Sequence, residues 1–115
     1  MKKEKEKGVV WKGRLSSGRK AYIKQQSIGF GCAIYGKSWK CGYIEFGKKD
    51  LPSEEECNRF PVYGGITYIG DSHISSKSAI GFDTSHGRDS DWSINHVKAE
   101  LEDLDQYIRY SRRSK

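Results

Sequence analysis

Three residues that could do chemistry stand within a seven-residue stretch of this chain: Asp83, His86 and Asp89. A carboxylate beside an imidazole can orient the ring and raise its pKa, as in a general base. Two carboxylates and one imidazole also suit a metal ion as ligands. In a structural loop, the same Asp side chains would accept hydrogen bonds from backbone N–H groups. We favour a structural or ligand-orienting role, because a second set of acid, base or nucleophilic residues is missing.

A glycine pair precedes this cluster, with Gly64 and Gly65 followed by Thr67 and Tyr68. The backbone N–H groups of a glycine-rich turn can surround an anion. The sequence lacks the Gly-x-Gly-x-x-Gly and Gly-Lys-Ser/Thr patterns of nucleotide-binding loops. We therefore favour a turn that requires positive φ over an anion site, and keep the four residues as candidate binding residues.

The positive charge of the chain is concentrated in its first half. Residues 1–49 carry thirteen Lys and Arg against three Glu, a net charge of +10, whereas residues 50–115 carry eight against twelve acids, a net of −4. Such an excess favours a polyanionic partner, although a solvated surface with a basic tail explains it as well. Aromatic residues alternate with these cations, as in sheets that bind single-stranded nucleic acids or nucleotides. The candidate binding residues here are Lys12, Arg14, Lys24 and Trp39.

The 115 residues fit one domain, expected over 8–110, between a disordered basic N-terminus at 1–7 and a basic tail at 111–115. The odd set of Cys32, Cys41 and Cys57 contains no Cys-x-x-Cys, which argues against a disulfide scaffold or a zinc finger. The chain has no apolar run long enough to span a bilayer and no signal-peptide pattern. We expect a cytoplasmic protein with no bound cofactor or metal.

Short runs rich in β-formers, separated by turn residues, predict an antiparallel sheet. Ser53 with Glu56 three positions later matches a capping box and predicts a short helix. The last two strand candidates are joined by a polar loop and could pair as a hairpin. The expected strands cover residues 9–15, 20–25, 30–35, 40–46, 62–69 and 79–82.

One long amphipathic helix is predicted at the end of the chain. Its apolar stripe consists of residues spaced by three or four positions, Ser93 is a natural N-cap, and Glu100, Glu102, Asp103 and Asp105 are expected on the opposite face. One helix on one face of an antiparallel sheet makes an α+β fold. An open sheet edge would also allow a homodimer. The stripe consists of Ile94, Val97, Leu101, Leu104 and Ile108.

Several blocks in the second half of the chain occur in a characteristic order. They are Cys41-Gly-Tyr-Ile44, Val62-Tyr-Gly-Gly-Ile-Thr-Tyr68, Ile80-Gly-Phe-Asp-Thr-Ser-His-Gly-Arg-Asp89 and Val97-Lys-Ala-Glu-Leu-Glu102. Over roughly residues 40–108 the chain resembles a group of small, uncharacterised proteins encoded by bacteriophages and prophages. In that group Cys often stands at the position of Thr84 and His at the position of Tyr63, which weakens a metal site here.

The resemblance implies a phage or prophage origin, and by analogy a protein that acts by binding. Our leading hypothesis is a non-enzymatic antagonist of bacterial immunity, of the anti-CRISPR or another anti-defence type. Its partner in the host cell would be a defence protein or a nucleotide-type anion. The alternatives are a nucleic-acid-binding protein that uses the basic aromatic sheet, a metal-dependent hydrolase at Asp83, His86 and Asp89, and an inhibitor whose acidic helix mimics nucleic acid.

Overall fold

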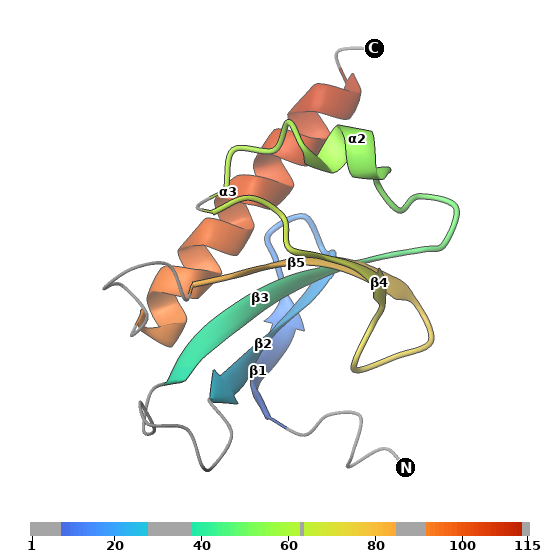
Figure 1. Cartoon of the computed structure of the whole chain (residues 1–115). Coiled ribbons are helices and arrows are strands. Elements are labelled where there is room, and N and C mark those ends of the chain that lie inside the picture. The colour runs from blue at the N-terminus through green and yellow to red at the C-terminus, as the bar shows by residue number, and fades with distance from the viewer. Residues whose placement is uncertain (1–7, 28–37, 63, 85–91, 114–115) are drawn as a thin grey trace.

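The computed structural model describes residues 8–27, 38–62, 64–84 and 92–113. Within them, five strands form one antiparallel sheet in the order β1-β2-β3-β5-β4, and a long helix packs on it (Figure 1). The predicted α+β class is therefore confirmed, and the last two strands pair as the predicted hairpin. The strands are β1 (Val9–Arg14), β2 (Lys20–Ser27), β3 (Ser38–Phe46), β4 (Tyr68–Asp71) and β5 (Ser78–Asp83).

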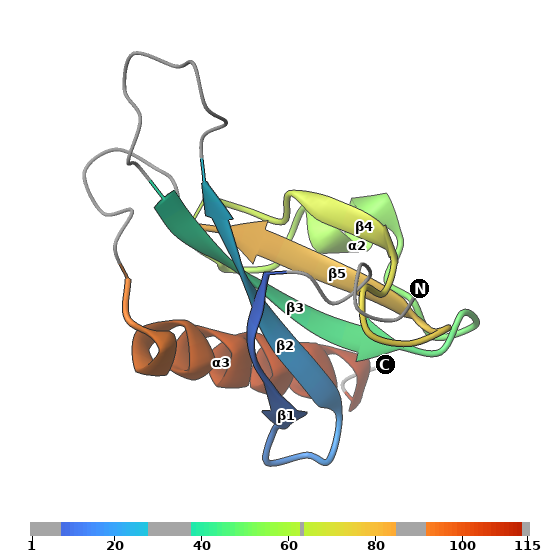
Figure 2. The same ribbon diagram turned by 90° about the horizontal axis from the view of Figure 1, so that it is seen from below.

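Helix α3 (Ile94–Arg113) covers one face of the sheet, which we call the proximal face (Figures 1 and 2). The predicted stripe faces the sheet, because Val97, Leu101, Leu104 and Ile108 are buried among the apolar side chains of β2, β3 and β5. The predicted N-cap is also found, since the Ser93 hydroxyl accepts a hydrogen bond from the His96 backbone N–H at 3.0 Å. The helix continues to Arg113.

Gly42 in the central strand lets α3 lie this close to the sheet. A Cβ atom at Gly42 would lie 3.0 Å from side-chain atoms of Phe82 and Val97 and 3.1 Å from Leu101. Any larger residue would push the helix away from the strand, and the dense packing of the core would be lost.

Asp105 departs from its expected position on the solvent side of α3. Its side chain is fully buried, and it accepts hydrogen bonds from Ser17 Oγ at 2.6 Å and Arg19 Nε at 3.0 Å. Glu102, one turn earlier, accepts bonds from the backbone and hydroxyl of Ser16. The β1–β2 turn supplies these donors. The Asp105 carboxylate is therefore buried by a contact with a distant part of the chain, which helical periodicity does not predict.

One strand prediction needs revision. Residues 62 and 64–67 form no strand, and β4 begins only at Tyr68. The Gly65 N–H closes a turn onto the Val62 carbonyl at 2.9 Å, with φ of 74° at Gly64 and 80° at Gly65. The strand expected at 30–35 lies outside the described residues.

The predicted short helix is present as α2 (Glu54–Cys57), and the Ser53 hydroxyl accepts a hydrogen bond from the Glu56 N–H. Arg112 joins it to the end of α3 through the Glu56 carboxylate at 3.5 Å. No helix among the described residues has the length and apolar composition that crossing a membrane requires.

Asp105→Asn tests whether the buried carboxylate fixes the helix to the turn. We expect the free energy of unfolding to fall by about 2–4 kcal/mol, because Arg19 and Ser17 lose a charged acceptor that is shielded from water. Asp103→Asn removes the same charge from an exposed position of the same helix, and should change stability by less than about 0.5 kcal/mol. Equal effects of the two variants in urea unfolding would contradict this role.

Candidate functional site

The predicted Asp83, His86 and Asp89 cluster is only partly described. Asp83 ends β5 opposite Cys41 of β3, on the face of the sheet away from α3, which we call the distal face. His86 and Asp89 lie outside the described residues, so a catalytic or metal-binding role for the cluster stays a prediction. The described part of the chain contains no group of three His, Cys, Asp or Glu side chains suited to a metal. Thr84 is buried, and its hydroxyl donates to the Lys40 carbonyl at 2.9 Å.

Gly64, Gly65 and Thr67 lie away from the cationic strands. The glycines form the turn described above, and the Thr67 N–H donates to the Gly81 carbonyl at 2.9 Å. Thr67 and Tyr68 line a cleft of about 650 Å³ between α2 and β4. The glycine pair thus meets the conformational demand of a turn, and its residues do not join the predicted basic residues in one site.

The predicted basic residues, by contrast, share the distal face. Lys12 stands opposite Tyr22, Arg14 opposite Lys20, and Lys24 opposite Val9 and Cys41. Because alternate residues of a strand point to one face, β1 and β2 place four cations side by side there. We call Lys12, Arg14, Lys20 and Lys24 the cationic strip. Lys20 was missed by the sequence-based choice of residues, although its period-two spacing from Lys24 was available.

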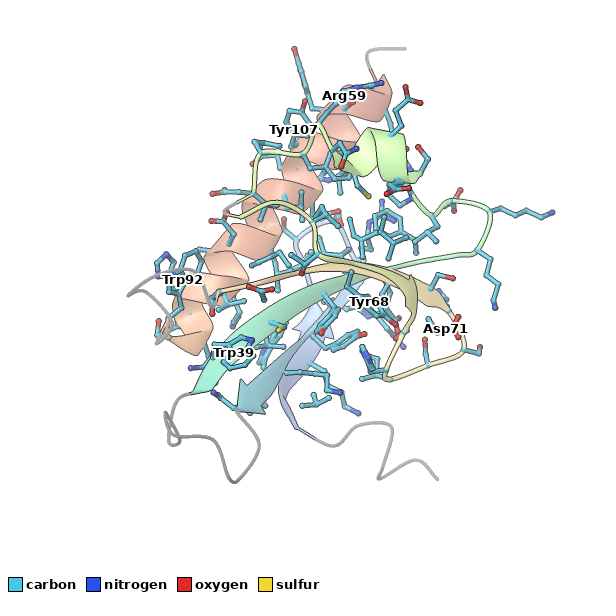
Figure 3. The ribbon with its side chains drawn as sticks, in the orientation of Figure 1. Trp39, Arg59, Tyr68, Asp71, Trp92 and Tyr107 are labelled. Atoms are coloured by element: carbon cyan, nitrogen blue, oxygen red, sulfur yellow. The ribbon has the colours of Figure 1, made fainter. Side chains whose placement is uncertain are left out.

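Trp39 and Tyr68 also lie on the distal face, at opposite ends of an aromatic cluster (Figure 3). The rings of Tyr22 and Tyr43 stack at 4.7 Å between centroids with an angle of 11° between their planes. Tyr68 and His73 meet Tyr43 edge-on at 5.5 and 5.1 Å. Offset and edge-on contacts of this kind stabilise aromatic clusters beyond the area that they bury.

This cluster is core rather than binding surface. Tyr22 is fully buried and Tyr43 is 5% exposed, so neither ring can stack on a ligand base. The connection between β4 and β5 supplies His73 and Ile74 to the packing around them. Among the described residues of the distal face, the half-buried Trp39 and Tyr68 are the rings left for contact with a ligand.

Glu45 anchors the β4–β5 connection to the distal face. Its side chain is 2% exposed, and its Oε2 accepts hydrogen bonds from the hydroxyls of Ser72 and, at 2.6 Å, Ser75. Its other oxygen, Oε1, is buried without a hydrogen-bond partner among the described residues. A buried carboxylate needs such donors, so Glu45 and the two serines hold this loop in place.

The protonation states on this face follow from burial. Burial raises the pKa of the Tyr22 phenol to about 12, and burial together with the Asp83 carboxylate raises the pKa of the Cys41 thiol to about 11. Burial, assisted by Lys24, lowers the pKa of His73 below its usual 6.5. At neutral pH the phenol and thiol thus keep their protons, and Cys41 is a poor nucleophile.

The hydrogen bonds of Tyr22 agree with a neutral His73. The His73 backbone N–H donates to the Tyr22 oxygen at 2.9 Å, and the Tyr22 oxygen lies 2.8 Å from His73 Nδ1. The phenol proton can then donate to an unprotonated Nδ1. A proton on Nδ1 would remove that acceptor.

A hollow of about 260 Å³ lies where the cationic strip meets the β4–β5 connection. Three cations line it from the strands, and Ile74 and Ser75 line it from the loop. Positive side chains that line such a hollow can hold an anion. The described residues here offer no activated nucleophile, so the chemistry that this arrangement supports is binding.

Comparisons with protein-family models, with curated proteins and with solved structures gave no match for this chain.

Gly81→Ala tests the packing under the aromatic cluster. A Cβ atom at Gly81 would lie 2.4 Å from the Tyr43 ring and 2.9 Å from the Gly42 carbonyl oxygen. We expect a loss of about 1–3 kcal/mol in the free energy of unfolding, because Tyr43 has no room to move. Gly47→Ala, whose Cβ would meet only Asp50 Oδ2 at 3.7 Å, is the control and should cost less than about 1 kcal/mol. A larger loss in the control than in Gly81→Ala would refute the steric account.

His73 should make stability depend on pH below neutrality. Its pKa is lower in the folded chain than its ordinary 6.5, so the unfolded chain binds the proton first as the pH falls. The contribution of His73 to the free energy of unfolding should therefore decrease from pH 6.5 downward and become constant below the folded-state pKa. His73→Asn keeps an acceptor near the Nδ1 position but does not titrate, so urea unfolding should show a shallower decrease over this range. Identical pH profiles would exclude the contribution of His73.

Proposed function

We propose that this chain is a non-enzymatic binding protein that holds an extended nucleotide-type anion, a single-stranded nucleic acid, on the distal face of its sheet. The observation that carries this proposal is the cationic strip: two neighbouring strands present four positive side chains on one face. Lys12, Arg14 and Lys20 are exposed, and Lys24 is half-buried.

The spacing within the strip suits a chain of anionic groups. Lys12 and Arg14 are two residues apart on β1, about 7 Å, and Lys20 and Lys24 are four residues apart on β2, about 14 Å. Arg14 and Lys20, directly opposite on the paired strands, are about 5 Å apart. The cations therefore form a row along each strand rather than one point charge. Such a row can contact successive phosphates and release their counterions, which gives affinity without sequence specificity.

Three arginines of the described chain contact acidic side chains that belong to the fold. Arg19 and Arg109 lie 3.0 and 3.7 Å from the buried Asp105 carboxylate, and Arg112 pairs with Glu56. These side chains are engaged near α3, on the far side of the sheet from the strip. This division supports the distal face as the surface for an anionic partner.

The aromatic contribution to binding is smaller than the sequence suggests. With Tyr22 and Tyr43 buried, Trp39 and Tyr68 are the aromatic rings that the described part of the distal face offers for stacking on bases. We therefore infer binding that is led by phosphate contacts, with steep salt dependence and weak base preference.

The setting proposed for this binding is a bacterial cell infected by a phage. The support is the resemblance of residues 40–108 to small phage proteins. In such a cell, a protein that binds nucleic acids or nucleotides would keep them from a host defence system that uses them, and would thereby antagonise that system. Direct binding to a host defence protein is the competing form of the same proposal.

The salt dependence of binding tests the cationic strip. If all four cations contact phosphates of a single-stranded oligonucleotide, the slope of log K against log salt should contain about −3 from the strip. Lys20→Ala combined with Lys24→Ala should make the measured slope shallower by about 1.4.

Lys48→Ala combined with Lys49→Ala is the matched control, because it removes the same charge from exposed residues beyond the end of β3. The control should leave the slope close to that of the parent chain. Absence of binding, or equal slopes for the two double variants, would refute binding by the strip. Fluorescence anisotropy at several salt concentrations provides the measurement.

A further inference from the structure

The hollow beside the cationic strip combines two kinds of recognition group. Lys12, Arg14 and Lys20 approach it from the strands, and Ser75 approaches it from the β4–β5 connection. Cations alone would accept any phosphate. The hydrogen bonds that Ser75 already makes add a second requirement, which is a hydrogen-bond donor on the ligand.

The Ser75 hydroxyl is fixed as an acceptor. Its proton is donated to Glu45 Oε2 at 2.6 Å, and its oxygen accepts the Lys77 backbone N–H at 3.1 Å. A hydroxyl has one proton and two lone pairs, so what remains for a ligand is one lone pair. Glu45 is buried and also binds Ser72, which keeps the carboxylate from turning and releasing the Ser75 proton.

The cations of the hollow are partly positioned in advance. Arg14 Nη1 donates to the Gly18 carbonyl at 2.8 Å, which holds the guanidinium against the β1–β2 turn. A guanidinium has five N–H donors, so this bond leaves others for a phosphate. Lys20 stands directly opposite Arg14 in the register of the two strands.

A ligand that contacts both the cations and the Ser75 lone pair needs an anionic group and, close to it, a hydrogen-bond donor. In RNA, the 2′-hydroxyl lies next to the phosphate and can donate a hydrogen bond. DNA offers the same phosphates and lacks this donor. Resting on the proposed function, we propose that Ser75 recognises the ribose 2′-hydroxyl and that the distal face prefers single-stranded RNA to single-stranded DNA.

The first test uses the unaltered chain and three oligonucleotides of one sequence: RNA, DNA and RNA with 2′-fluoro substitution. The 2′-fluoro strand keeps a ribose-like sugar conformation but has no 2′ donor. RNA should bind about three- to tenfold more tightly than DNA, the value of one net hydrogen bond, and the 2′-fluoro strand should bind like DNA. Equal affinities for RNA and DNA, or a 2′-fluoro strand that binds like RNA, would overturn the assignment of Ser75.

The second test uses variants of the loop. Ser75→Ala should lower RNA affinity more than DNA affinity and so bring the two to the same level, whereas Ser75→Thr, which keeps the hydroxyl, should retain the preference. Ser76→Ala changes an exposed neighbour and should also retain it. A preference that persists in folded Ser75→Ala would refute the inference, and if that variant fails to fold, the 2′-fluoro comparison decides.

The outcomes separate this inference from the proposed function. Salt-dependent binding of RNA and DNA with equal affinity would leave the cationic strip as a binding surface and remove the role of Ser75. Binding of neither strand would remove both.

Discussion

The buried Asp105 carboxylate is the contact on which the arrangement of the fold depends. It binds Ser17 and Arg19 of the β1–β2 turn from the middle of α3, so the helix is fixed across one face of the sheet. Arg19 in turn lies over the Phe46 ring at 4.4 Å, which ties the polar contact to the apolar core. Because the turn and the helix hold each other, the opposite side chains of β1 and β2 remain on the distal face.

The distal face is organised by a second buried carboxylate. Glu45 binds the hydroxyls of Ser72 and Ser75, and this brings the β4–β5 connection over the paired rings of Tyr22 and Tyr43. Gly81 leaves the space that the Tyr43 ring occupies. The same loop that completes the aromatic packing thus also forms one wall of the cationic hollow.

The sequence predicts local features well and misses those that depend on distant contacts. The apolar stripe of α3 and the cap at Ser53 are local patterns, and both are confirmed. Asp105 was expected in solvent because its partners are more than 80 residues away in the chain. Most of the strand predicted at 62–69 is replaced by the turn at Gly64 and Gly65. The burial of Tyr22 and Tyr43 depends on the β4–β5 connection, whose position cannot be predicted from composition.

The acidic second half of the chain contacts the basic first half through α3 and the β1–β2 turn, and this contact bears on function. An acidic helix that mimicked nucleic acid would need to present its carboxylates to a partner, yet Glu102 and Asp105 bind the β1–β2 turn instead. These acids help to hold the turn between the two strands that carry the cationic strip. Acidic side chains of α3 thus help to position the two strands that carry the cationic strip. This arrangement favours an anionic partner over a basic one.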